Sequence, residues 1–211
     1  MPRRATAHAQ QVRRYVSTGE SGERDWLDWP GETIFAQARA HHAALIDGLL
    51  AEVDRRTRRR RLPPEPVVDF PAFVRARLEP MVRGLLPASV QEPALAKLVP
   101  GVRLVTPQTV GAVLGEIDEL RTAWDVANLY LDAVGAKRLD PANWAPLGLA
   151  SGHECFVSVH YFTLCERFDD FVVHEAAHML NDFKRRDVGL PHTRRKEWLL
   201  GIWFRHRELF A

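Results

Sequence analysis

The chain has 211 residues, of which 46% are hydrophobic and 27% are charged, and its formal net charge is +2. This near balance of charge argues against a dedicated nucleic-acid binder, and two cysteines exclude a disulfide framework. No apolar run is long enough to span a membrane, and the N-terminal residues lack the apolar stretch of a secretory signal. We therefore expect a cytoplasmic protein, most simply a bacterial one, without a membrane partner; the oligomeric state stays open.

The N-terminal third begins with polar, basic residues that show little apolar periodicity. We predict that residues 1–30 form a flexible basic tail. Helical spacing starts after Thr33, a suitable N-cap, and continues into the arginine cluster Arg55–Arg61 before the proline-rich residues 62–66. Residues 31–66 are thus predicted to be a helix and a linker. The cluster is most simply a solvated helix end, and contact with phosphate or an acidic partner is the alternative.

The remainder, residues 67–211, is predicted to form one mostly helical α+β domain with a small sheet. The pattern favours short helices separated by prolines, one long helix, a loop, a strand with a period of two, a helix and a last helix. In order, these cover residues 69–107, 108–134, 141–152, 153–164, 167–183 and 193 onward. Gly135 fits the position that ends the long helix, and Gly148 and Gly152 fit turns in the loop.

A chemically specific motif, His174-Glu175-Ala176-Ala177-His178, lies in the predicted helix 167–183. On a helix, His174 and His178 are one turn apart and point the same way, so two imidazoles can share one Zn²⁺. Glu175 lies beside the first histidine, where its carboxylate can take a proton from a water molecule and deliver it to a leaving amine. The motif therefore predicts Zn²⁺ as cofactor and Glu175 as general base.

At these residues the sequence resembles the gluzincins, the zinc peptidases whose third ligand is a glutamate on a following helix. The resemblance covers residues 153–211 and implies a zincin-like metallopeptidase domain acting on a peptide or protein substrate. It also implies an edge strand beside the zinc helix, to which an extended substrate adds as a strand. The longer metzincin motif is excluded, because Asn181 and Lys184 occupy its glycine and histidine positions.

Two residues compete for the third ligand that the resemblance implies. Glu208 begins the string Glu-Leu-Phe-Ala, which is similar to the Glu-x-Phe-Ala string of these families, and we favour it. Glu197, the runner-up, follows His178 at the spacing of the aminopeptidase branch. In these families an acidic residue commonly lies one turn after the ligand, and it is missing for both candidates. The position one turn after Glu197 is Gly201, and the position one turn after Glu208 would lie beyond Ala211. We expect either a truncated chain or a site completed differently.

Four further residues are candidates around the site. Asp170 and Asp182, one turn before and after the histidines, are candidates to orient them, and the alternative is a helix-end charge. His192 is a candidate to stabilise an oxyanion and Tyr161 to reach the cleft. Two alternative functions remain open: a zincin-fold binding protein without catalysis, and a helical module that binds nucleic acid or a partner through Arg55–Arg61.

Overall fold

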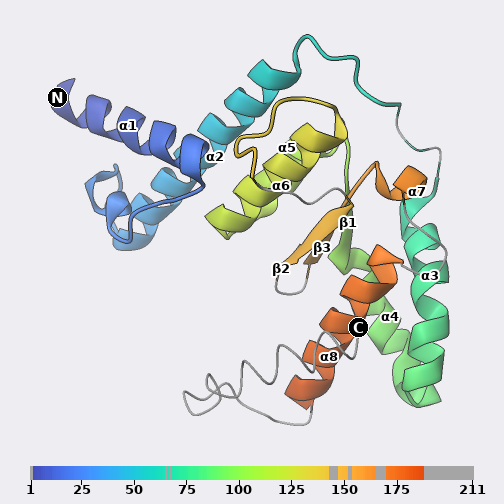
Figure 1. Ribbon diagram of the computed structural model, residues 1–211. Helices are drawn as coiled ribbons and strands as arrows, with labels where there is room; N and C mark the ends of the chain where they lie inside the picture. Colours follow the sequence, from blue (N-terminus) through green and yellow to red (C-terminus); the bar gives the residue numbers. More distant parts are fainter. Residues whose placement is uncertain are drawn as a thin grey trace. The chain divides into compact units, whose positions relative to one another are not determined.

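The computed structural model describes residues 2–64, 66, 68–142, 147–151, 154–164 and 170–187. Figure 1 shows its elements in chain order. They are α1 (Pro2–Thr18), η1 (Asp25–Asp28), α2 (Ile34–Thr57), α3 (Phe70–Leu85), α4 (Ala88–Gly101), β1 (Val102–Val105), α5 (Val110–Glu116), α6 (Leu120–Ala133), β2 (Gly148–Ser151), β3 (Glu154–Ser158), α7 (Tyr161–Leu164) and α8 (Phe171–Asp187). The predicted α+β class, mostly helical with a small sheet, is confirmed.

The chain divides into two compact units, and the division differs from the predicted one. The first unit comprises Met1–Glu65, Val105–Pro146 and Ser158–His160, and the second comprises Pro66–Leu104, Leu147–Val157 and Tyr161–Ala211. A contiguous domain over residues 67–211 is therefore not observed. Helices α5 and α6 belong to the first unit because their apolar faces pack on α2.

The predicted tail is wrong for most of residues 1–30, because Pro2–Thr18 form helix α1 and pack on α2. Tyr15 is fully buried and donates a hydrogen bond from its hydroxyl to the Leu120 carbonyl at 2.7 Å. The indole N–H of Trp124 donates in turn to the Val16 carbonyl at 3.0 Å. These contacts with α6, distant in sequence, give a helix with few apolar residues a packed position that its own composition does not reveal.

The predicted helix 108–134 is observed as two helices, with extended backbone at Ile117 between them. Its predicted end is confirmed. Gly135 has a φ of 64°, and hydrogen bonds run from Gly135 N to Asp132 O and from Ala136 N to Leu131 O. This pair of bonds is the Schellman arrangement, which satisfies carbonyls at the end of a helix and favours glycine at the left-handed position.

The second unit has a core formed by α3, α4, α8 and the strands. Its buried residues include Val74, Leu78, Leu98, Val157 and Met179. The prolines are predicted to separate short helices, and this is wrong for three of them: Pro80 lies inside α3, and Pro93 and Pro100 lie inside α4. Among the residues that the structure describes, no helix combines the length and apolar composition needed to cross a membrane.

The three strands are ordered β1-β3-β2, and β2 pairs with β3 in antiparallel register, with Gly148 opposite Val157 and Ser151 opposite Glu154. The predicted strand 153–164 is shorter than expected, and residues 161–164 turn into α7 instead. It is also the central strand, so the expectation of an edge strand here is wrong. The edge strand that contacts α8 is β2, from the predicted loop.

Gly148 is required by close packing and not by a turn. A Cβ atom placed there would lie 2.4 Å from the Phe156 carbonyl oxygen and 2.3 Å from a ring carbon of Phe171, the first residue of α8. The absence of a side chain therefore lets the hairpin and the start of α8 approach each other.

Candidate metal centre

Asp170, the residue before helix α8, caps the first turn of that helix. The Asp170 carboxylate accepts hydrogen bonds from the backbone N–H groups of Val172 at 3.1 Å and Val173 at 3.3 Å, and the Asp170 carbonyl accepts from His174 N at 2.9 Å. This is N-cap geometry, in which an aspartate satisfies donors of the first helical turn. The structure therefore starts α8 four residues after the predicted start at Arg167.

The cap is itself held by side chains from two other helices. The Tyr161 hydroxyl of α7 donates to Asp170 Oδ1 at 2.8 Å, and Arg77 of α3 lies 3.4 Å from Asp170 Oδ2. Tyr161 is only 2% exposed and belongs to the core of this unit. It is thus buried against the cap, and the idea that it reaches into a cleft finds no support in its position.

One face of α8 is apolar and buried. Val172, Ala176, Met179 and Leu180 are at most 2% exposed and pack in the core with α3 and α4. This orientation follows from apolar residues that recur at positions three and four apart. It places the two histidines on an adjacent face of the helix.

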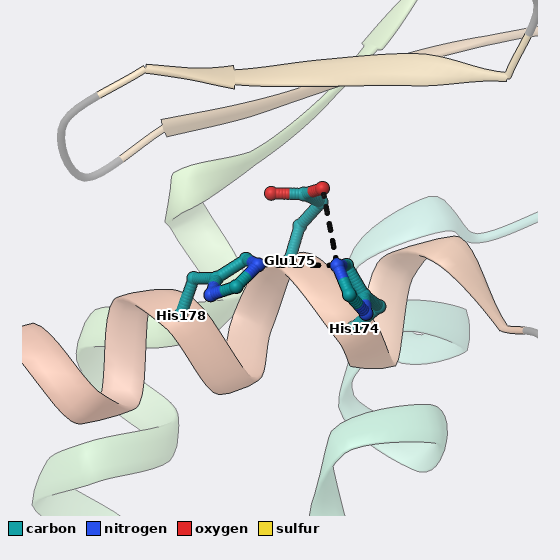
Figure 2. Close-up of side chains that lie close together, drawn as sticks. All are labelled: His174, Glu175 and His178. Carbon is teal, nitrogen blue, oxygen red and sulfur yellow. Dashed lines mark hydrogen bonds and ion pairs between the residues drawn. The ribbon is translucent and has the colours of Figure 1, made fainter. Parts of the chain in front are cut away.

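His174, Glu175 and His178 lie close together on that face, as Figure 2 shows. The two Nε2 atoms of His174 and His178 are 3.1 Å apart, and Oε1 of Glu175 is 3.9 Å from His174 Nε2. The imidazole planes are nearly perpendicular, at 89°. The His178 residue is buried, at 3% exposed, whereas the His174 side chain is 36% exposed, so access from solvent is at the His174 end.

The arrangement fits a zinc ion. Two nitrogens that each lie about 2.0–2.1 Å from one tetrahedral metal are about 3.3 Å apart. The observed separation of 3.1 Å is close to this value. The same distance also suits a hydrogen bond between two neutral imidazoles, in which one Nε2 donates and the other accepts. The donor set, two imidazoles with a carboxylate alongside, is one that zinc accepts.

The Glu175 carboxylate points from α8 toward the antiparallel strands β2 and β3 (Figure 2). Cys155, a fully buried residue of β3, has a thiol whose pKa is raised well above its usual value, first by burial and then by the negative charge of Glu175. The thiol therefore stays protonated and uncharged beside Glu175.

The other predicted site residues fall into two groups. Asp170 acts as a helix cap through the contacts described, and nothing tests its proposed effect on the histidines. Asp182 is part of α8, but its side chain is outside the described residues, as are His192, Glu197 and Glu208. The third ligand stays a prediction. Arg77 escaped the sequence reasoning, since no sequence signal connects an arginine of α3 with the cap of α8.

Comparisons of the chain with protein-family models, with curated proteins and with solved structures gave no match. The resemblance to the gluzincins therefore depends on the motif and on the geometry that α8 gives it.

Proposed function

We propose that the chain is a zinc-dependent metallopeptidase, in which His174 and His178 hold the metal through their Nε2 atoms. The observation that supports this most strongly is the convergence of the two nitrogens, 3.1 Å apart, beside a carboxylate on a helix whose adjacent face packs in the core. The buried His178, the partly buried Glu175 and the more exposed His174 present their ligand atoms to one another, and a divalent cation accepts this donor set.

When bound, Zn²⁺ supplies Lewis acidity that polarises a carbonyl group and makes water a stronger nucleophile at neutral pH. The protein side chains divide the remaining tasks. Glu175 accepts a proton on its carboxylate from the attacking water and delivers it to the amine of the leaving peptide. Cys155, whose pKa is raised by burial and by the charge of Glu175, remains a neutral neighbour of that carboxylate.

A peptide or protein substrate would lie along the sheet. Strand β2 is at the edge of the described sheet and contacts α8, so an extended substrate segment can add to it by backbone hydrogen bonds. Glu208 is the preferred third ligand and Glu197 the runner-up, as the resemblance implies.

Metal analysis tests the site directly. Purified protein should carry about one zinc per chain, and His178→Gln should lose it, whereas His42→Gln, which changes a histidine outside the motif, should retain it. Glu208→Gln and Glu197→Gln, compared in the same way, identify the third ligand by the variant that loses zinc.

Catalysis needs a separate variant. Glu175→Gln should retain zinc but lower peptide-cleavage rates by about 10²–10⁴-fold, the usual contribution of a positioned base. Wild-type protein without zinc would refute the metal centre. Zinc with unchanged cleavage by Glu175→Gln would refute the assigned base, and zinc without any cleavage of an unbiased peptide library would favour a binding protein of the same fold.

A further inference from the structure

A groove of about 380 Å³ lies between α1 and α2 in the first unit. Val12 and Val16 of α1 and Ala51 of α2 line its apolar part. Gly48 brings the helices together beneath it, because a Cβ atom there would lie 2.3 Å from Cγ1 of Val12. The close approach of the two backbones creates a concave apolar surface rather than a filled interface.

The same groove is bordered by three arginines, Arg13, Arg55 and Arg56, against the single carboxylate of Glu52. Glu52 accepts hydrogen bonds from Arg55 at 2.6 and 2.7 Å and from Arg56 at 2.6 Å, and the two arginines lower its pKa to about 2. Glu52 therefore stays ionised, and it balances only one of the three positive charges. Within the described part of the chain, Arg13 forms no hydrogen bond or ion pair.

The three arginines differ in whether their guanidinium groups already have hydrogen-bond partners. Arg56 donates from Nη1 to the Lys137 carbonyl at 2.8 Å and to that of Arg138, so it helps to hold the backbone that follows α6. The Arg55 side chain is 67% exposed and the Arg13 residue is also exposed. Arg13, on the α1 side of the groove, is available to a ligand, whereas Arg55 already uses Nε and Nη2 to bind Glu52 and offers only its remaining N–H groups.

Positive charge is in excess on α1 and directly after α2, where residues 58–61 are all arginines, whereas α2 itself has three arginines and three acidic residues. Helix α1 contains four arginines and no acidic residue, and residues 52–61 contain six arginines against Glu52 and Asp54. This excess is concentrated on one part of a chain with a net charge of only +2.

We infer that the α1–α2 groove is a docking site for an acidic protein segment that also presents apolar side chains. A carboxylate of such a segment pairs with Arg13 through two parallel hydrogen bonds, and a second carboxylate contacts the N–H groups of Arg55 that Glu52 does not use. The apolar side chains of the segment pack on Val12, Val16 and Ala51. A nucleic acid fits less well, because no aromatic side chain lines the groove for base stacking and the apolar part of the groove offers a phosphate backbone no partner. This inference is independent of the proposed metallopeptidase activity.

Peptide binding tests the inference with the chain of residues 1–211. The probe is a fluorescent 18-residue helical peptide with glutamates on one face and leucines on the other, titrated by anisotropy at 50 and 200 mM salt. Its controls are the same peptide with leucine changed to serine, the same peptide with glutamate changed to lysine, and a single-stranded oligonucleotide of equal charge. We expect the acidic, leucine-containing peptide to bind at least tenfold more tightly than each control.

A matched pair of variants localises the binding. Arg13→Gln with Arg55→Gln should weaken peptide binding about tenfold, whereas Arg59→Gln with Arg60→Gln removes the same charge outside the groove and should weaken it less than threefold. Both pairs alter exposed side chains, and circular dichroism establishes that each variant remains folded. Equal losses from the two pairs, tighter binding of the oligonucleotide, or no binding of the acidic peptide would each overturn the inference.

Discussion

The cap of α8 offers a quantitative test of how the second unit supports the candidate metal centre. Asp170→Ala removes the acceptor for two backbone N–H groups, a change that costs about 1 kcal/mol at an N-cap. It also removes the acceptor of the buried Tyr161 hydroxyl, at about 1–2 kcal/mol, and an ion pair with the half-exposed Arg77, at no more than about 1 kcal/mol. We expect a total loss of about 2–4 kcal/mol in the free energy of unfolding.

Urea unfolding followed by circular dichroism measures this loss, and hydrogen exchange of α8 locates it. Tyr161→Phe alone should cost about 1 kcal/mol, but close to nothing in a chain that already carries Asp170→Ala, because the two residues share one hydrogen bond. Strict additivity of the two substitutions, to within about 0.3–0.5 kcal/mol, would refute the idea that Tyr161 acts through the cap.

Asp170→Asn separates capping from an effect on the histidines. Asparagine caps helices about as well as aspartate, so stability should fall by less than half as much as in Asp170→Ala. If Asp170 acts only as a cap, zinc affinity should change less than about twofold. If it orients His174 electrostatically, the affinity should fall by about 10–100-fold, which is typical when the partner of a metal ligand is lost.

Three further substitutions test individual structural claims. His41 is 4% exposed, and burial lowers its pKa although the nearby Asp25 carboxylate acts to raise it. The stabilising contribution of neutral His41 is therefore present above about pH 6.5, the pKa of histidine in the unfolded chain. This contribution is lost as the pH falls below that pKa. Thermal melting at pH 8 and pH 5.5 should show a smaller acid destabilisation in His41→Gln than in wild type, and an unchanged difference would contradict this. Gly148→Ala should destabilise the second unit by about 1–3 kcal/mol and weaken zinc binding, since the added methyl group meets the Phe156 carbonyl; unaltered urea unfolding would show that the hairpin adapts. Asn128→Leu should cost about 2–4 kcal/mol in urea unfolding, because the Asn128 side chain accepts from two backbone N–H groups after α6, and a loss below 1 kcal/mol would indicate that water replaces it.

The elements that the sequence predicted well are those whose signals are local. Thr33 accepts a hydrogen bond from Ala36 N as the expected N-cap of α2, and Gly135 ends α6 with the expected left-handed φ. The spacing of His174 and His178 likewise depends only on a helix being formed, and the helix is formed. In each case, the residues that determine the structure lie within about one helical turn of one another.

The elements that escaped prediction depend on partners distant in the sequence. Strand β2, with the sequence Gly-Leu-Ala-Ser, lacks the β-branched and aromatic residues typical of strands and is extended because β3 pairs with it. Helix α1 is packed through Tyr15 and Val16 against residues more than 100 positions away. The capping of α8 by Asp170 is local, but the hydrogen bond from Tyr161 and the ion pair with Arg77 require α7 and α3 to be assembled around it, so these supports could not be predicted from spacing alone.

The interleaving of the two units in the chain has a consequence for synthesis. A ribosome releases α1 and α2 long before α5 and α6, the partners that bury their apolar faces, so the first unit stays incomplete until residues 105–146 emerge. The pairing of β1 with β3 is also delayed, because about 50 residues separate the two strands in the chain. Helix α8 follows the rest of the described chain, and the two histidines would therefore meet a metal ion only after the surrounding core of α3, α4 and the hairpin is available. The helix that carries the candidate ligands is therefore synthesised after the core residues of α3, α4 and the hairpin on which it packs.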